Sequence, residues 1–144
     1  MMTIAYEKDI IGWANEQARL LRAGKFDLLD LKNIAEEIED VGKSEQRELA
    51  NRMAILLAHL LKWEHQPERR GASWQLTIRN QRKAVLRRLE DTPSLKGKLV
   101  DNRWLEAVWS DAVIQAATET GLSDFPEECP WTLDEILESS CFFE

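Results

Sequence analysis

The sequence predicts an all-α fold, a compact bundle of five or six helices around one buried central helix at about residues 45–65. Apolar residues recur at intervals of three and four along most of the chain, and no segment alternates in the manner of a strand. The four Pro and six Gly lie between these periodic segments, where turns are expected. With 144 residues, 44% of them hydrophobic, the chain is long enough for one core, so we expect a single domain over residues 1–144 that ends in a flexible tail.

The segment 45–65 carries the strongest pattern. Its core positions step by four, three, four and three residues, and the positions between them are also largely apolar. A helix that is apolar on nearly all sides must be enclosed by other helices, so this segment is expected at the centre of the fold. Pro67 ends it, because the residue before a proline is pushed out of the helical region. The core positions are Leu49, Met53, Leu56, Leu60 and Trp63.

Two helices are expected before the central one. The first covers about residues 4–22 and stops at Gly24. The second has an apolar stripe that Gly42 interrupts, and Ser44 suits the N-cap of the helix that follows. We therefore expect the chain to break between the second helix and the central one. The stripe of the second helix contains Leu31, Ile34, Ala35, Ile38 and Val41.

The helices after the central one have clear start and stop signals. Ser73 is the expected N-cap of a fourth helix, and Thr92-Pro93 opens the next helical segment. Asp101-Asn102 is expected to divide that segment into a short and a long helix, and Gly121 ends it. Thr132 and Glu135 fit a capping box at the start of a short terminal helix.

Charge is strongly segregated along the chain. The net charge of −7 combines −3 in residues 1–61, +6 in residues 62–103 and −10 in residues 104–144. The last segment contains no Lys or Arg. Either the acidic segment folds over the basic one, or the two form separate charged surfaces.

Several ordered motifs lie along the chain, at residues 57–70, Trp74 and residues 78–82, 92–95, 119–122 and 125–130. Together they resemble the bacterial DUF29 family. The resemblance covers nearly the whole chain, from Tyr6 to about Leu137. It implies a helical domain to which no function is assigned, and it supplies no catalytic residues that could be transferred to this chain.

Glu36, Glu37 and His59 are the candidate metal ligands, because helical bundles build metal sites from Glu and His on facing helices. The usual Glu-x-x-His pair is absent, since neither His has a Glu three residues before it. His59 and His65 are six residues apart, roughly 240° around a helix, so they face different ways. We favour a structural interpretation, in which His59 is a hydrogen-bonded residue beside the core, and we expect no cofactor.

Arg82 is predicted to lie at the margin of the core face of the fourth helix. A buried arginine needs a carboxylate or several carbonyls as partners, since an unpaired buried charge is costly. Glu36, Glu37 and Glu39 are candidate partners, so Glu39 and Arg82 are predicted to form a polar cluster. We favour a structural ion pair that fixes the helix register, or an extended side chain whose head reaches water, over a ligand site around Arg82.

Arg79, Lys83 and Arg87 step by four residues and form one row of positive charge on the fourth helix. Such a row could bind nucleic-acid phosphates, a protein partner or the acidic C-terminal segment of the same chain. The chain is acidic overall, with a sequence pI of about 5.0, which is unlike a typical nucleic-acid binder. We therefore favour a protein partner, or the chain's own acidic segment, over nucleic acid.

Other sequence signatures are absent. The chain has no basic leader followed by an apolar run, no stretch of roughly 18 apolar residues that could cross a bilayer, and no C-x-x-C. A cytoplasmic location without membrane contact is expected. Exposed apolar residues near Phe142-Phe143 are one route to homo-oligomers. Neither a Gly-rich phosphate loop nor a G-x-S-x-G is present.

These observations favour a protein-interaction or adaptor module that uses charge-segregated surfaces. The motivation is a strong core, a segregated surface charge and no convergent catalytic set. The alternative is a metal-dependent or nucleic-acid-processing enzyme that uses Glu36, Glu37, His59 and Arg82.

Overall fold

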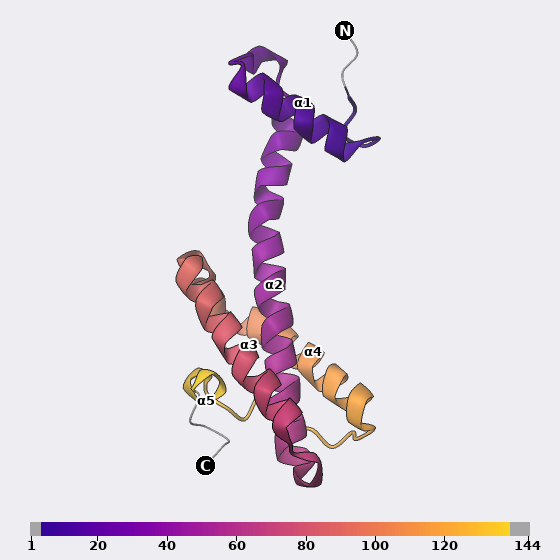
Figure 1. Cartoon of the computed structure of the whole chain (residues 1–144), viewed down its shortest axis with the longest axis vertical. Helices are drawn as coiled ribbons and strands as arrows, with labels where there is room; N and C mark the ends of the chain where they lie inside the picture. Colours follow the sequence, from indigo (N-terminus) through magenta and orange to yellow (C-terminus); the bar gives the residue numbers. More distant parts are fainter. Residues whose placement is uncertain (1–3, 139–144) are drawn as a thin grey trace. The chain divides into compact units, whose positions relative to one another are not determined.

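Helix α2 (Leu31–His65) contributes to two compact units of the chain, residues Met1–Ser44 and Glu45–Glu144. The computed structural model describes residues 4–138. Within them there is no strand, and the all-α prediction is confirmed. The single domain expected over residues 1–144 stays a prediction. The elements run in the order α1 (Ile10–Arg22), η1 (Phe26–Leu28), α2, η2 (Pro67–Arg69), α3 (Ala72–Asp91), η3 (Pro93–Val100), α4 (Asn102–Thr120) and α5 (Leu133–Leu137), where η marks a 3-10 helix (Figure 1).

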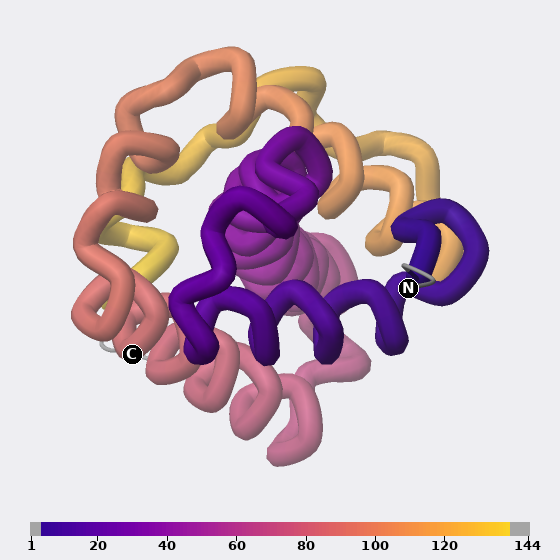
Figure 2. The backbone as a smooth tube through the Cα atoms, turned by 90° about the horizontal axis from the view of Figure 1, so that it is seen from above, coloured from indigo at the N-terminus to yellow at the C-terminus, as the bar shows by residue number. Residues whose placement is uncertain are grey.

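The C-terminal unit has the 45–65 part of α2 at its centre. Figure 2 shows this part nearly end-on, with α3, α4 and the C-terminal segment arranged around it. Leu49, Leu56, Leu60 and Leu61 are fully buried there. The predicted central helix is therefore confirmed within this unit. Its core partners come from every later helix except η2, and include Ile78, Val85 and Leu89 of α3, Leu95 of η3, Val108, Ala112 and Ala116 of α4, and Ile136 of α5.

The N-terminal unit is held together mainly by polar contacts around one tryptophan. Trp13 of α1 donates from Nε1 to Oδ2 of Asp30 at 3.0 Å, and its ring meets that of Tyr6 edge to face with centroids 4.8 Å apart. The backbone N–H of Asp30 donates to Oε1 of Gln17 at 2.8 Å. Among the described residues of this unit only Trp13, Gln17 and Leu20 are buried. Its apolar core is therefore small.

The expected break at Gly42 and Ser44 is wrong, because α2 is continuous from Leu31 to His65. Gly42 does not have a positive φ, so the backbone does not turn there. A glycine inside a helix costs only about 1 kcal/mol relative to alanine. Ending the helix and nucleating another costs more, because the first turn of a new helix fixes several residues for a single hydrogen bond. The local signals at Gly42 and Ser44 are therefore outweighed by the propagation of α2.

Two predicted helix starts are also corrected. The first helix begins at Ile10 instead of residue 4, because Oδ1 of Asp9 accepts a hydrogen bond from the N–H of Gly12 at 3.0 Å and caps it there. The fourth begins at Ala72, so Ser73 lies inside its first turn. There the carbonyl of Gly71 accepts the first helical hydrogen bond, from Gln75 at 3.1 Å.

The remaining local signals are confirmed. Asp101 caps α4 through its side chain, which accepts from the N–H groups of Arg103 and Trp104. Gly121 ends α4 with φ of 75°. Thr132 and Glu135 form the expected capping box of α5. Within the described part of the chain no helix combines the length and the apolar character that a bilayer span requires. Phe142 and Phe143, the predicted route to homo-oligomers, lie outside the described residues.

The central position of α2 can be tested by truncating one of its side chains. Leu60 is 0% exposed, so Leu60→Ala is expected to lower the free energy of unfolding by about 2–5 kcal/mol through lost burial and the cavity left behind. Ile114→Ala is the matched control, since Ile114 is 64% exposed on α4 and its loss should change stability by less than about 0.5 kcal/mol. Denaturant unfolding followed by circular dichroism measures both. Equal effects would contradict the packing described above.

Candidate functional site

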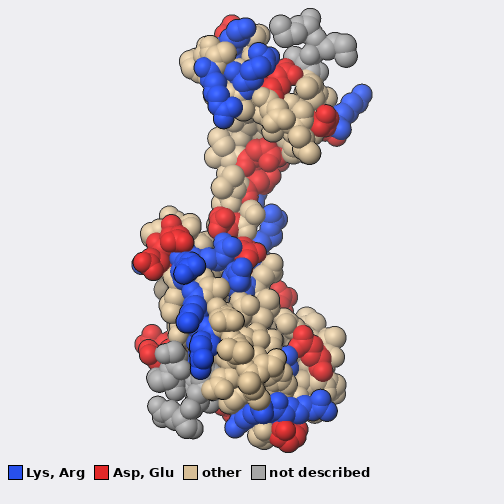
Figure 3. Space-filling view, viewed as in Figure 1, with Lys and Arg blue, Asp and Glu red and all other residues tan. Residues whose placement is uncertain are grey.

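Three basic side chains form the most distinctive surface of the C-terminal unit. We define the basic face as Arg79, Lys83 and Arg87, which are exposed on successive turns of α3. Figure 3 shows a band of Lys and Arg along this part of the surface. The opposite side of α3 is buried in the core, so the three cations necessarily point outward. Among residues 4–138 no carboxylate lies within ion-pair distance of them.

Arg82 lies between the basic face and the core, and it holds α5 against α3. The residue is only 2% exposed. Its Nε donates to the carbonyl oxygen of Ile136 at 2.8 Å, and its Nη2 donates to that of Glu135 at 3.2 Å. The carbonyls near a helix C-terminus have no partner within the helix, so they are available as acceptors. The sequence allowed either a carboxylate or several carbonyls as partners of Arg82, and both of these hydrogen bonds are made to carbonyl oxygens.

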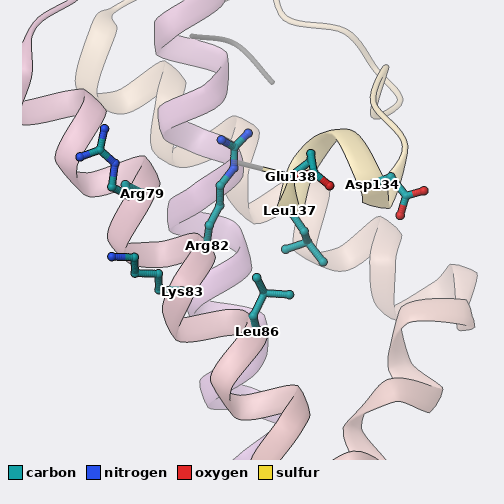
Figure 4. A pocket seen from close by; sticks show the side chains of 7 residues that line it. All are labelled: Arg79, Arg82, Lys83, Leu86, Asp134, Leu137 and Glu138. Carbon is teal, nitrogen blue, oxygen red and sulfur yellow. The ribbon is translucent and has the colours of Figure 1, made fainter. Parts of the chain in front are cut away.

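A pocket of about 460 Å³ lies between α3 and α5, on one side of the basic face (Figure 4). Figure 4 shows Arg82 and Leu86 directed from α3 toward α5, with Leu137 directed back from α5. The pocket thus combines cations with an apolar floor and two carboxylates at its far side. Its described lining consists of Arg79, Arg82, Lys83, Leu86, Asp134, Leu137 and Glu138.

A second hollow of about 580 Å³ lies on the other side of the basic face. Arg88 bridges two glutamates there, with Nη1 2.9 Å from Oε2 of Glu45 and Nη2 3.3 Å from Oε1 of Glu48. Nε of Arg52 is 2.9 Å from the same oxygen of Glu48. Arg52 and Arg88 are thus paired with glutamates, so among the described residues the unpaired cations that line this hollow are Lys83 and Arg87 of the basic face. Asn80, Lys83, Ala84, Arg87, Asp91 and Thr92 complete the described lining.

A separate polar group surrounds Lys62, which is 6% exposed near the end of α2. Its Nζ donates to Oε2 of Glu119 at 2.5 Å and lies 5.4 Å from the ring centroid of Trp74. The hydrogen bond from Lys62 is the largest cause that lowers the pKa of Glu119. A buried lysine requires such a partner, since its charge would otherwise be costly. This pair ties the C-terminal end of α4 to the central helix.

His59 is half-buried beside this pair and is neutral near pH 7. Burial, together with the charge of Lys62, lowers its pKa. Its Nδ1 lies 2.9 Å from the carbonyl oxygen of Ile55, so Nδ1 carries the proton and donates it. This is the structural role expected from the sequence, a hydrogen-bonded residue beside the core. Nε2 then carries the lone pair of the neutral ring.

The candidate acidic residues of the N-terminal unit lie on the first part of α2. Glu37 accepts a hydrogen bond from the hydroxyl of Tyr6, whereas Glu36 and Glu39 are exposed. The hydrogen bond to Glu37 is the main cause that raises the pKa of Tyr6 to about 12, followed by burial and by the charges of Glu37, Glu36 and Asp40. The pairing of Glu39 with Arg82 stays a prediction. Across residues 4–138 no group of three or more His, Cys, Asp or Glu could hold a metal ion.

The model of one protein family, described as the domain of unknown function DUF29, matches residues 5–142. The chain belongs to the DUF29 family. This confirms the resemblance seen in the sequence, which included the stretches 57–70 and 119–122. No curated protein and no solved structure matches the chain significantly.

Two of the stretches that resemble the DUF29 family meet in the structure through a pair that the sequence reasoning missed. Lys62 belongs to the stretch 57–70 and Glu119 to the stretch 119–122, and they form the buried ion pair described above. A lysine in an otherwise apolar, enclosed segment was the available signal, because such a residue needs an acidic partner. Its partner could not be chosen from the sequence, since many acidic residues follow it.

Replacing Arg82 tests whether it fixes α5. Arg82→Met keeps much of the side chain's length but leaves the carbonyls of Glu135 and Ile136 without their donor, so we expect a loss of about 2–4 kcal/mol in the free energy of unfolding. Arg79→Met, on the exposed side of the same helix, should cost less than about 0.5 kcal/mol. Chemical denaturation measures both. An Arg82→Met variant as stable as Arg79→Met would show that α5 does not depend on this side chain.

The single tyrosine of the chain allows a direct titration. Tyr6 is expected to ionise at about pH 12 instead of 10, observed by its ultraviolet absorbance while circular dichroism verifies that the chain stays helical. Because the folded pKa lies above the unfolded one, the stability contributed by Tyr6 is present below about pH 10 and is lost as the pH rises through about 12. Glu37→Gln should shift the titration back toward 10, and Glu36→Gln much less. A midpoint near 10 in the unmodified chain would contradict the contact with Glu37.

Proposed function

We propose that this DUF29 chain is a protein-interaction module whose basic face binds an acidic segment of another protein. One observation carries the proposal. Arg79, Lys83 and Arg87 are exposed on successive turns of one helix and lack carboxylate partners among the described residues, whereas several other cations of the same unit are paired. The paired ones are Arg52, Lys62, Arg88 and Lys98. Three unpaired cations on successive turns leave a positive potential that a partner's carboxylates would neutralise.

The surroundings of the basic face favour a protein over a nucleic acid. Leu76 and Leu86 are 52% and 47% exposed and lie on the same side of α3 as the basic face, because positions 76, 79, 83 and 86 share one face of a helix. The phosphate backbone of a nucleic acid has no apolar groups that could cover these leucines. An amphipathic acidic helix supplies both carboxylates and apolar contacts.

The hollows on either side of the basic face define the shape of the expected partner. Each has a volume of several hundred cubic ångströms, enough to receive one or two side chains of a docked helix. A matching helix would carry three acidic residues four positions apart, with a leucine-like residue at each end of that row. Its apolar residues would contact Leu76 and Leu86.

A charge-reversal experiment tests this proposal. The variant Arg79→Glu/Lys83→Glu/Arg87→Glu is compared with the unmodified chain for binding of a helical peptide that has three Glu four positions apart and a Leu at each end. At about 0.5 kcal/mol for each exposed ion pair, we expect at least about tenfold weaker binding, measured by fluorescence anisotropy. Binding to the unmodified chain should weaken as salt is added.

The matched control reverses three exposed cations elsewhere in the same unit, Arg47, Lys96 and Arg103. It changes the net charge equally and should leave peptide affinity within about threefold of the unmodified chain. Equal losses in both variants would mean that only net charge matters, and would overturn the proposal. So would binding of DNA or RNA oligonucleotides at the basic face in preference to the peptide.

A further inference from the structure

Exposed apolar side chains are concentrated in the N-terminal unit. Nine of the fourteen large apolar residues that are exposed in the described part of the chain belong to it, although it holds less than a third of the sequence. Large clustered apolar surfaces on soluble proteins generally mark contact sites. The nine are Ile4, Ile10, Ile11, Leu21, Phe26, Leu28, Leu31, Ile38 and Val41.

Three of these residues lie on one side of α2. Leu31, Ile38 and Val41 are 67%, 68% and 66% exposed. At 100° per residue, every position of α2 between 31 and 42 that lies within about 60° of Ile38 is apolar or glycine. The charged positions of this stretch all fall outside that sector. We call this surface the α2 stripe, and it consists of Leu31, Ile34, Ala35, Ile38, Val41 and Gly42.

Gly42 gives an independent indication that another helix approaches the stripe. A glycine within a helix is less favourable than alanine, so it usually serves a conformational or packing purpose. Here φ is not positive, and a Cβ atom built at Gly42 would meet nothing within 4 Å in this chain. Neither backbone conformation nor internal crowding therefore explains the glycine. The close approach of a second helix would explain the glycine, because small residues allow two helix backbones to come close together.

The pattern of the α2 stripe is complementary to itself. A twofold axis through Ile38, perpendicular to α2, places Ile38 opposite its own equivalent and Ile34 opposite Val41. The same operation places Ala35 opposite Gly42, so the two small residues face each other. We propose that the α2 stripe packs antiparallel against the α2 stripe of a second copy of this chain, forming a homodimer.

Charge supports the antiparallel orientation. The next position of the same face of α2 is Glu45. In a parallel pair the two Glu45 carboxylates would lie side by side and repel each other. In the antiparallel pair the two Glu45 carboxylates, each of which keeps its ion pair with Arg88 of its own chain, are far apart, and each lies opposite the first turn of α2 of the second copy. The N-terminus of a helix favours a negative charge nearby.

Sedimentation equilibrium of the full chain tests the association. The mass should rise with concentration from 16.7 kDa toward twice that value. Ile38→Lys places two like charges at the axis and should weaken dimerisation at least about a hundredfold. Ile114→Lys is the control, because Ile114 is 64% exposed on α4 and the charge change is the same. It should leave the dissociation constant within about threefold.

Disulfide pairing tests the orientation, with Cys129 and Cys141 replaced by Ser. When the Ile34→Cys chain is mixed with the Val41→Cys chain and oxidised, the mixed disulfide should dominate over either homodisulfide. A parallel pair would instead give homodisulfides. Added salt should leave the dimer intact, whereas it weakens binding at the basic face of α3, so this inference and the proposed function fail separately.

Three results would overturn the inference. The first is a constant mass of 16.7 kDa at the highest concentration that stays in solution. The second is equal weakening of the dimer by Ile38→Lys and Ile114→Lys. The third is a predominance of homodisulfides in the mixing experiment, which would exclude the antiparallel arrangement.

Discussion

The structure of the C-terminal unit depends on enclosing residues 45–65 of α2. This segment has apolar side chains around nearly its whole circumference, so no single neighbouring helix could remove it from water. Helices α3 and α4, with η3 and α5, each contribute buried residues to the same core. Because the inner sides of these helices are used for packing, only their outer sides remain for recognition. The burial of one segment thus decides where a binding surface can lie.

The two units of the chain are stabilised in different ways. The C-terminal unit has a continuous apolar core, with a few buried polar groups such as Lys62 and Arg82 whose partners come from distant segments. The N-terminal unit relies on hydrogen bonds that converge on Trp13 and Asp30, and it leaves much apolar surface exposed. A unit with so little buried apolar surface gains stability from contact with another molecule. The small core of this unit and its large exposed apolar surface are thus two consequences of the same fact, that few of its apolar side chains are buried.

The candidate site was only partly predictable. The row formed by Arg79, Lys83 and Arg87 follows from their spacing, because helical geometry brings residues four apart onto one face. The hollows beside the row could not be foreseen, since they depend on where Glu45 and α5 lie against α3. Likewise, a need for partners at Arg82 followed from its position near the core, whereas the identity of those partners did not.

The sequence by itself determined which segments are helical and where most helices stop, because periodicity, caps and glycine stops act within a few residues. Asp101, Gly121 and Thr132 act in the structure as their local signals predict. Tertiary structure alone decided the pairs that join distant segments, such as Lys62 with Glu119 and Arg82 with the carbonyls of α5. It also shows α2 continuing through Gly42. Many combinations of such partners are compatible with one sequence pattern, and only the packing of the core selects among them.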